Sequence, residues 1–381
     1  MQKRMKSIER VRTALAHQEP DRVPLGLWGS YYTLNDDTYF QILKYLKLGD
    51  PVVPFRRYLN RNSNYYDDRV LERLETDMRY VWSGFTDLGG ARPDTLIDAW
   101  GVQWKRIGPH ITSSAPPLAG AHIEQVEEYS WPDVEKYLTI PALKERIKEL
   151  KKSGEHAIVA RAVNSYGPFE QASVLRGREQ FYMDLILEPE LAQQLIDRCT
   201  DVIVRLNEIY VDLIGYEVDM FEIPGDDYGG TEDLLISPKM FDDMIKPALS
   251  RIIQPIKQFR KDLPVAFHTD GAVMKIVDRL VEIGVDVLNP LEPLPSNDWE
   301  QVKRLYGDRL CFMGGIDIKK AMTGPVKGVD EEVKRCMKLF APGGGYIMTP
   351  SNHLQKDVPP ENIALLYEFG KKYGQYPISS L

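Results

Sequence analysis

The chain has 381 residues, of which 43% are hydrophobic, and its formal net charge is −8. This length and hydrophobic content suit one large domain, such as a barrel with added N-terminal helices. The negative charge argues against a general nucleic-acid-binding surface, which would be basic, and no stretch approaches the apolar length of a membrane span.

The N-terminus and the cysteines predict a cytoplasmic location. Residues 1–7 are charged but lead into an amphipathic helix, not into the apolar core of a signal peptide. Cys199, Cys311 and Cys336 are widely spaced. We expect a reducing environment, no disulfide framework, and thiols that pack in the core.

The first half of the chain mixes helices, two strands and one irregular stretch. Residues 50–130 are rich in aromatic side chains and short strands, including 78–82 and 100–105. We interpret them as an excursion that covers the mouth of a barrel. The remaining elements of this half are predicted as helices at 4–18, 36–48, 176–187 and 189–214 and strands at 23–28 and 157–163.

The second half contains five short apolar runs, each of which ends in a small polar cluster. They lie at 219–227, 265–271, 285–292, 310–317 and 346–353. Such runs, bounded by Gly and Pro and separated by amphipathic helical segments, predict the strands of a parallel sheet. The expected fold class is α/β, a (β/α)8 TIM barrel with its site at the C-terminal ends of the strands. We predict one domain over 1–381, with an N-terminal extension and excursion at 1–130 and the main barrel at 131–381.

Several polar residues at these strand ends are candidates for a chemical site. His268 and Asp270 are two residues apart, so on a strand their side chains point to the same face. Glu222 ends another apolar run, and a carboxylate inside a barrel is costly unless it is paired or binds a metal. Asp227 is interpreted as facing the site, and His353 as a further ligand or proton donor.

Each candidate also has a structural interpretation. Asp270 is suitably placed to cap a following helix, and Asp226 to organise the glycine-rich turn after it. His353 and Glu292 are equally compatible with ordinary loop residues. Both kinds of interpretation remain open on the sequence alone.

The ordered motifs of the chain resemble the uroporphyrinogen decarboxylase superfamily over nearly its whole length. The matching stretches are 10–15, 20–24, 70–79, 98–102, 225–230, 235–241, 245–247, 268–271 and 358–363. The resemblance implies a (β/α)8 barrel with a deep cleft. It also implies one of two activities, porphyrinogen decarboxylation or cobalamin-dependent methyl transfer of the kind found in anaerobes.

Two departures from the family patterns favour the methyltransferase branch. The N-terminal strand of the decarboxylases has a pattern that resembles Met-Arg-Gln-Ala-Gly-Arg, whose arginines can pair with substrate carboxylates. The matching stretch of this chain, residues 26–32, contains no arginine. The thiol methyltransferases carry a His-x-Cys pair and a later Cys as zinc ligands, whereas here Asp270 follows His268. A carboxylate makes the metal harder, so it is better matched to oxygen than to sulfur.

The resemblance therefore implies a corrinoid-dependent methyltransferase with zinc as its cofactor. The expected donor is a small methylated compound, an aryl methyl ether that undergoes O-demethylation, and the expected acceptor is a corrinoid carried by a partner protein. The alternatives are a porphyrinogen-type decarboxylase and a non-catalytic module that binds a small molecule or a corrinoid. The predicted metal ligands are His268, Glu222, Asp270 and His353. The predicted catalytic residues are Glu222, Asp227 and Asp270. The predicted substrate-binding residues are Trp28, Tyr31, Arg161, Asn164, Tyr166, Asn289 and Asn352.

Overall fold

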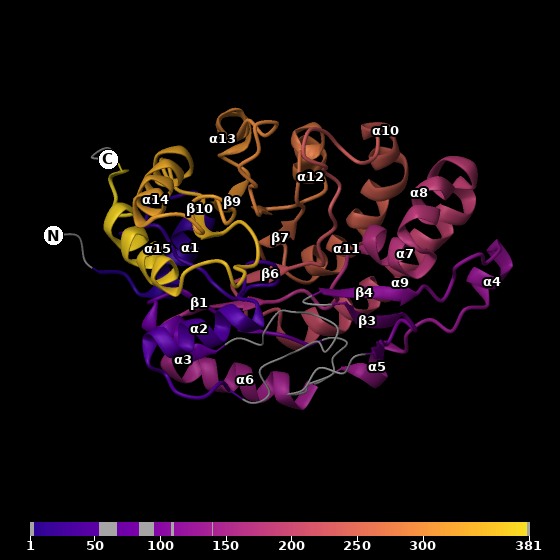
Figure 1. Ribbon diagram of the computed structural model, residues 1–381, viewed down its shortest axis with the longest axis horizontal. Coiled ribbons are helices and arrows are strands. Elements are labelled where there is room, and N and C mark those ends of the chain that lie inside the picture. The colour runs from indigo at the N-terminus through magenta and orange to yellow at the C-terminus, as the bar shows by residue number, and fades with distance from the viewer. Residues whose placement is uncertain (1–3, 53–66, 84–94, 108–109, 139, 379–381) are drawn as a thin grey trace.

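A curled parallel sheet of seven strands forms the centre of the molecule (Figure 1). The computed structural model describes residues 4–52, 67–83, 95–107, 110–138 and 140–378. All neighbouring strands of the sheet run parallel, in the order β1-β5-β6-β7-β8-β9-β10. These strands are β1 (Met78–Val81), β5 (Ala157–Ala160), β6 (Met220–Glu222), β7 (Val265–His268), β8 (Val287–Asn289), β9 (Cys311–Ile316) and β10 (Tyr346–Pro350). The five strands predicted in the second half are confirmed, and so is the parallel α/β class.

An extended segment at residues 23–27 lies between the two edge strands of this sheet. Leu25 forms a parallel bridge with Met348 of β10, and the Gly26 amide donates to the Met348 carbonyl at 3.0 Å. On the other side, the Asp77 amide donates to the Leu25 carbonyl at 2.8 Å, directly before β1. The predicted strand at 23–28 therefore takes the position between β10 and β1, although its pairing is limited to this bridge and these bonds.

Helices alternate with the strands and cover the outside of the sheet, as the period of the apolar positions predicts. Helix α9 packs against α7 and α11, and α14 packs against α15. The helices predicted at 4–18, 36–48, 176–187 and 189–214 are confirmed, with observed bounds of Ser7–Leu15, Asp36–Leu46, Arg178–Leu187 and Pro189–Ile214. The helices are α1 (Ser7–Leu15), α2 (Asp36–Leu46), α3 (Asp68–Arg73), α4 (Ile123–Glu127), α5 (Val134–Tyr137), α6 (Ile140–Ser153), α7 (Pro168–Arg176), α8 (Arg178–Leu187), α9 (Pro189–Ile214), α10 (Pro238–Met240), η1 (Phe241–Ile245), α11 (Lys246–Phe259), η2 (Met274–Ile276), α12 (Val277–Glu282), α13 (Trp299–Tyr306), α14 (Val326–Phe340) and α15 (Pro360–Tyr373).

The stretch expected to be an excursion is divided between two structures. Its strand at 78–81 is β1, which is fully buried and pairs with β5, so the barrel sheet begins well before residue 131. The predicted boundary at 130 is corrected accordingly. A separate antiparallel sheet contains β2 (Thr95–Ile97), β3 (Gln103–Ile107) and β4 (His110–Ala115). Residues 53–66 and 84–94, also assigned to the excursion, lie outside the described residues.

A buried ion network ties the N-terminal helix to the start of β1. The carboxylate of Asp77, which is fully buried, lies 2.6 Å from Arg10 Nη1 and 2.7 Å from Arg22 Nη1. It also accepts hydrogen bonds from the Ser7 hydroxyl and the Leu25 amide. These contacts stand at the N-terminal ends of the strands, the end that serves stability in such folds.

Two further expectations concern the whole chain. Cys199, Cys311 and Cys336 are buried and free, as predicted. Among the helices in the described part of the chain, none has the length and apolar character needed to cross a membrane.

Candidate functional site

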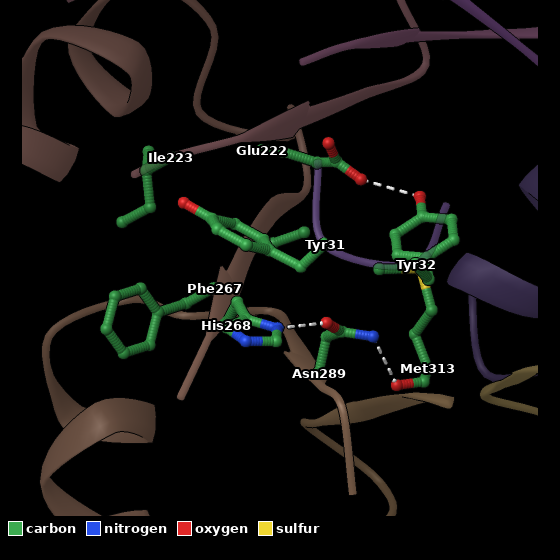
Figure 2. A pocket seen from close by; sticks show the side chains of 9 residues that line it. Tyr31, Tyr32, Glu222, Ile223, Phe267, His268, Asn289 and Met313 are labelled. Atoms are coloured by element: carbon green, nitrogen blue, oxygen red, sulfur yellow. Dashed lines mark hydrogen bonds between the residues drawn. The ribbon is translucent and has the colours of Figure 1, made fainter. Parts of the chain in front are cut away.

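The ring of His268, the last residue of β7, is held in one orientation by Asn289 of β8. His268 Nδ1 lies 2.6 Å from Asn289 Oδ1, and Asn289 Nδ2 donates to the Met313 carbonyl at 2.9 Å (Figure 2). Because a carbonyl only accepts, the Asn289 amide group must face Met313 and its oxygen must face His268. Nδ1 of His268 therefore carries a proton, and in the neutral ring Nε2 offers a lone pair.

Nε2 of His268 faces two carboxylates. It lies 3.4 Å from Asp270 Oδ2 and 3.9 Å from Asp227 Oδ1. Burial of the imidazole opposes its charged form, but Asp270 and Asp227 outweigh burial and raise the pKa of His268 to about 9. Loss of water and the neighbouring Asp270 charge raise the pKa of Asp227. The one nitrogen and two carboxylate oxygens lie within 4.8 Å of one another.

Two glycines allow the loops after β6 and β7 to meet, which brings the two carboxylates together. A Cβ on Gly229 would lie 2.4 Å from the Ala272 amide nitrogen and 2.8 Å from the Asp270 carbonyl oxygen. Gly271 has a φ of +85°, a backbone conformation that residues other than glycine rarely adopt. At this contact the Asp270 amide donates to Asp227 Oδ1 at 3.0 Å. The loop approach thus positions both carboxylates beside His268.

Asp270 is fixed from across the mouth and does not cap a helix. Asn352, in the loop after β10, donates from Nδ2 to Asp270 Oδ2 at 2.6 Å. The next helical turn, η2, begins at Met274, and its cap residue is Val273. The site interpretation of Asp270 is therefore favoured over the helix-cap interpretation, and Asn352 acts as a positioning partner.

Asp226 has the structural role that its position in the turn indicated. Its carboxylate accepts hydrogen bonds from the Phe169 and Glu170 amides, at 3.0 and 2.8 Å, and from the Tyr228 hydroxyl at 2.9 Å. It thereby caps the N-terminus of α7 from a distant part of the chain. Burial raises the pKa of Asp226 to about 7, although these three donors act in the opposite direction.

The structure removes Glu222 from the predicted ligand set. Glu222 is 3% exposed, and its Oε2 accepts from the Ser30 amide and hydroxyl at 2.9 and 2.5 Å. Its Oε1 accepts from the Tyr32 hydroxyl at 2.6 Å. In Figure 2 this carboxylate turns away from His268 toward Tyr32. Ser30 and Tyr32 were missed on the sequence, since nothing local links them to a residue about 190 positions away.

The other predicted residues separate into those at the site and those beside it. Tyr31 stacks on His268, with ring centroids 4.1 Å apart, and so lies at the site. His353 is not one of the three residues of the cluster of Asp227, His268 and Asp270, and its role as a ligand stays a prediction. Trp28 is fully buried, with its ring 5.5 Å from that of Tyr39.

Asn164 and Tyr166 contact the small antiparallel sheet and its flanking turn. Asn164 accepts from Trp100 Nε1 at 3.2 Å and donates to the Tyr166 carbonyl and to Gln171. The Tyr166 ring stacks on Trp104, with centroids 6.4 Å apart. The amide of Asn164 therefore orders the loop after β5. Arg161, at the end of β5, points into the barrel and is only 1% exposed.

An open groove borders the cluster on the side of β8 to β10. Its volume is about 400 Å³, in the range of small-molecule sites. Asp270 and Asn352 line this groove together with Glu292, Ile318 and Lys319. Lys319 pairs with Glu292 at 2.6 Å, so Glu292 is at the mouth but is bound to a neighbouring lysine. A small molecule in this groove would reach the carboxylate of Asp270.

The His268, Asp227 and Asp270 side chains fit a divalent cation. A histidine nitrogen and two carboxylate oxygens are ordinary zinc ligands, and three protein ligands leave a position open for substrate. The contact between Asn289 and Nδ1 is the support that a metal-binding histidine usually has. A cation would also offset the mutual repulsion of the two carboxylates, which otherwise share one histidine.

Comparisons with known proteins agree on the family. The family model described as uroporphyrinogen decarboxylase (URO-D) matches residues 101–373. Uroporphyrinogen decarboxylase of Pseudoalteromonas atlantica is 22% identical over 192 residues, 49% of each chain. Methylated-thiol–coenzyme M methyltransferase of Methanosarcina mazei is 23% identical over 224 residues, 58% of this chain and 57% of the relative. The chain thus spans about half the length of the curated relatives that it matches.

A solved structure has the same fold over almost the whole chain. A methyltransferase from Methanosarcina mazei aligns with a TM-score of 0.66, covering 97% of this chain and 99% of that one, at 18% identity. At this identity the likeness concerns the fold alone. The matched range of the family model, 101–373, includes Asp227, His268 and Asp270.

Proposed function

Because the chain belongs to the uroporphyrinogen decarboxylase family, we propose that it is a methyltransferase of that family. It moves a methyl group from the oxygen of a small methylated donor, an aryl methyl ether, to a cobalt(I) corrinoid carried by a partner protein. The observation that carries this proposal is the cluster of His268, Asp227 and Asp270 at the mouth of the barrel. A methylated-thiol–coenzyme M methyltransferase of Methanosarcina mazei is among the relatives by sequence, which supports the methyltransferase branch.

The donor chemistry follows from the character of these ligands. We propose that His268 Nε2, Asp227 and Asp270 hold one zinc ion. When bound, zinc supplies a Lewis acid beside the donor oxygen. Two carboxylates in place of thiolates make such a site hard, which favours an oxygen-bound methyl group over a sulfur-bound one. A methylated thiol, the donor class in the name of the Methanosarcina mazei relative, is therefore not proposed as the methyl donor of this chain.

The protein's own side chains have three tasks in this reaction. Asn289 keeps Nδ1 of His268 protonated and directs Nε2 toward the carboxylates. Asn352 holds Asp270 in the lining of the groove. As the methyl group leaves, the donor oxygen keeps the electron pair of the broken C–O bond and needs a positive group or a proton beside it. Without metal, the raised pKa of His268 lets Nε2–H provide that proton.

A decarboxylase is the second candidate, and one observation favours it. Uroporphyrinogen decarboxylases are among the relatives, and Arg161 places a buried cation inside the barrel. Such a cation suits a substrate carboxylate. However, residues 26–32 contain no arginine, and a substrate with many carboxylates requires several cations. This function is therefore kept as the alternative.

The test combines metal analysis with a methylation assay. Protein purified without a chelating column is expected to contain one zinc per chain, and His268→Ala is expected to lose both the zinc and the activity. His353→Ala is the matched control, because His353 lies outside the cluster and its variant is expected to keep the metal. Transfer is followed by the spectrum of cobalt(I) corrinoid protein mixed with methoxylated aromatics.

Two results would contradict the proposal. If His268→Ala kept one metal ion per chain, the assignment of His268 as a metal ligand would be wrong. No cobalt methylation with any donor, together with release of carbon dioxide from uroporphyrinogen, would assign the chain to the decarboxylase alternative.

A further inference from the structure

Arg161 projects into the interior of the barrel beside Glu222, level with Ala266 and two residues before His268 of the candidate site. It directly follows β5, and its amide donates to the Val81 carbonyl at 2.9 Å, which continues the ladder with β1. Val159 of β5 pairs with Met220 of β6. Because side chains alternate along strands, Arg161 and Glu222, each two residues further on, share one face. Glu222 lines the inner pocket of Figure 2, so this face is the interior.

The guanidinium of Arg161 is buried without a counter-ion. Its Nε and Nη1 atoms make no hydrogen bond within the part of the chain that the structure describes, and no carboxylate lies within ion-pair distance there. The other buried arginines of the described residues each have a counter-ion: Arg10 binds Asp21 and Asp77, Arg176 binds Asp184, and Arg79, whose Nη2 also makes no hydrogen bond, lies 3.8 Å from Asp68. An uncompensated buried charge costs several kcal/mol, so the lack of an ion pair at Arg161 requires an explanation.

The nearest acidic group does not provide that explanation. Both oxygens of Glu222 are already bound, by Ser30 and Tyr32. Among the described residues, Arg161 therefore remains a buried positive charge without an acidic partner, whereas the loops after β6 and β7 supply the carboxylates of Asp227 and Asp270.

We propose that Arg161 binds a carboxylate of the small molecule on which the protein acts. The planar guanidinium matches a carboxylate in shape and charge. A monoanion is favoured over a phosphate dianion, because Glu222, Asp227 and Asp270 make the rest of the mouth negative. The inference deepens the proposed function, on which it rests: the methyl donor is a methoxylated aromatic acid and not a neutral ether.

The positions of the strands allow one molecule to reach both groups. Arg161 directly follows β5 and His268 ends β7, with only β6 between these strands. The register places His268 two residues further along, so the two backbones are about 12 Å apart at the usual strand spacing and rise. A donor with its carboxylate at Arg161 directs its methoxy oxygen toward His268 and Asp270. The donor ring takes the position beside His268 that the Tyr31 ring occupies in Figure 2.

Equilibrium binding tests the subsite without methyl transfer. Isothermal titration compares the isomeric methoxybenzoates with the matching methoxybenzyl alcohols, which lack only the charge. Wild-type protein is expected to bind at least one acid more tightly than its alcohol. Arg161→Met is expected to lose about 10- to 100-fold in affinity for that acid, the usual worth of a charged hydrogen bond, and to keep its affinity for the alcohol. Arg161→Lys keeps the charge but not the planar donor set, and its affinity for the acid is expected to lie between those of wild type and Arg161→Met.

Stability of the ligand-free protein gives a second readout. Removing an unpaired buried charge relieves its desolvation cost, so Arg161→Met is expected to unfold at the same urea concentration as wild type or at a higher one. A large loss of stability would mean that Arg161 has a structural partner, and would overturn the subsite. Equal affinity of wild type for acid and alcohol would also overturn it, even if the Met variant failed to fold.

The same measurements separate this inference from the proposed function. Arg161-dependent binding of the acids without any cobalt methylation would leave the carboxylate subsite standing and remove the methyltransferase. Cobalt methylation from neutral ethers that is unaffected by Arg161→Met would support the methyltransferase and remove the carboxylate subsite.

Discussion

At the scale of single residues, the site depends on one histidine whose proton is placed by its neighbours. The amide of Asn289 donates to the Met313 carbonyl, and this bond determines which of its atoms faces His268. The sequence indicated that Asn289 contacts substrate, whereas its side chain is only 2% exposed and is used to orient the ring. Its effect on chemistry is therefore expected to act through His268.

Asn289→Leu is expected to weaken metal binding by about 10- to 100-fold, the usual loss when a residue that supports a metal-binding histidine is removed. Asn289→Asp keeps an acceptor for Nδ1–H and is expected to retain more affinity than Asn289→Leu. Titration of the metal-free proteins with zinc against a competing chelator measures both. Equal affinities for wild type and Asn289→Leu would show that the ring needs no such support.

His156 predicts a dependence of stability on pH away from the site. Burial and the nearby Arg79 charge lower the pKa of His156 to about 4, from 6.5 in the unfolded chain. The unfolded state therefore takes up a proton first as the pH falls, and folding loses stability between pH 6.5 and 4. His156→Gln is expected to lose less free energy of unfolding across this range. Urea denaturation at pH 7 and pH 5 measures the difference, and parallel losses in both proteins would contradict it.

At the scale of elements, the close contact of two loops assembles the cluster. The segment from Gly225 to Gly230 after β6 lies against the loop after β7, where Gly229 approaches Gly271 without room for a side chain. The same segment supplies Asp226, which caps α7, and Asp227, which faces His268. One short loop thereby links the position of a helix to the position of a ligand.

Gly229→Ala is expected to push these loops apart and to lower both zinc affinity and stability. Its Cβ would lie within 3 Å of three backbone atoms, and overpacking of this kind costs about 1–3 kcal/mol. Gly328→Ala in α14 is the matched control, since a Cβ there meets nothing closer than 3.7 Å and alanine favours a helix. Metal content and urea denaturation are compared for the two variants. Unchanged zinc affinity in Gly229→Ala would separate the loop contact from the site.

At the scale of the whole molecule, the two ends of the barrel have different tasks. The cluster of Asp227, His268 and Asp270 lies at the C-terminal ends of β6 and β7. The buried network around Asp77 lies at the N-terminal end of β1, where it fastens α1 and the segment at 23–27 to the sheet. Changes at the two ends are therefore expected to have separable effects.

Asp77→Ala is expected to destabilise the protein by about 3–5 kcal/mol, because it leaves the buried Arg10 and Arg22 charges without this partner. Zinc content of the folded variant is expected to stay at the wild-type level. Glu155→Ala breaks the exposed pair with Lys6 and is expected to change stability little. Urea denaturation and metal analysis provide the measurements. A folded Asp77→Ala protein without zinc would show that the two ends are coupled.

The local pattern of the sequence was sufficient to predict the strands and the end of the sheet at which the candidate site lies. Runs of three or four residues that end in His268, Asn289 or Glu222 become β7, β8 and β6, because burial on both sides of a parallel sheet requires such apolar runs. The spacing of His268 and Asp270 likewise predicted that both face one mouth. These features depend on neighbours along the chain, so a single sequence contains them.

Pairings between distant residues were decided only by the tertiary structure. The carboxylate of Glu222 is of a type that can bind a metal, but it accepts hydrogen bonds from Ser30 and Tyr32, which lie in a loop about 190 residues earlier. The strand at 78–81 was assigned to the excursion because nothing local distinguishes a barrel strand from a short surface strand. Arg161 was a plausible contact in the sequence, yet only the fold leaves its charge buried and unpaired. Hydrogen-bond partners and counter-ions are chosen in space, and that choice determines which polar residue is available for chemistry.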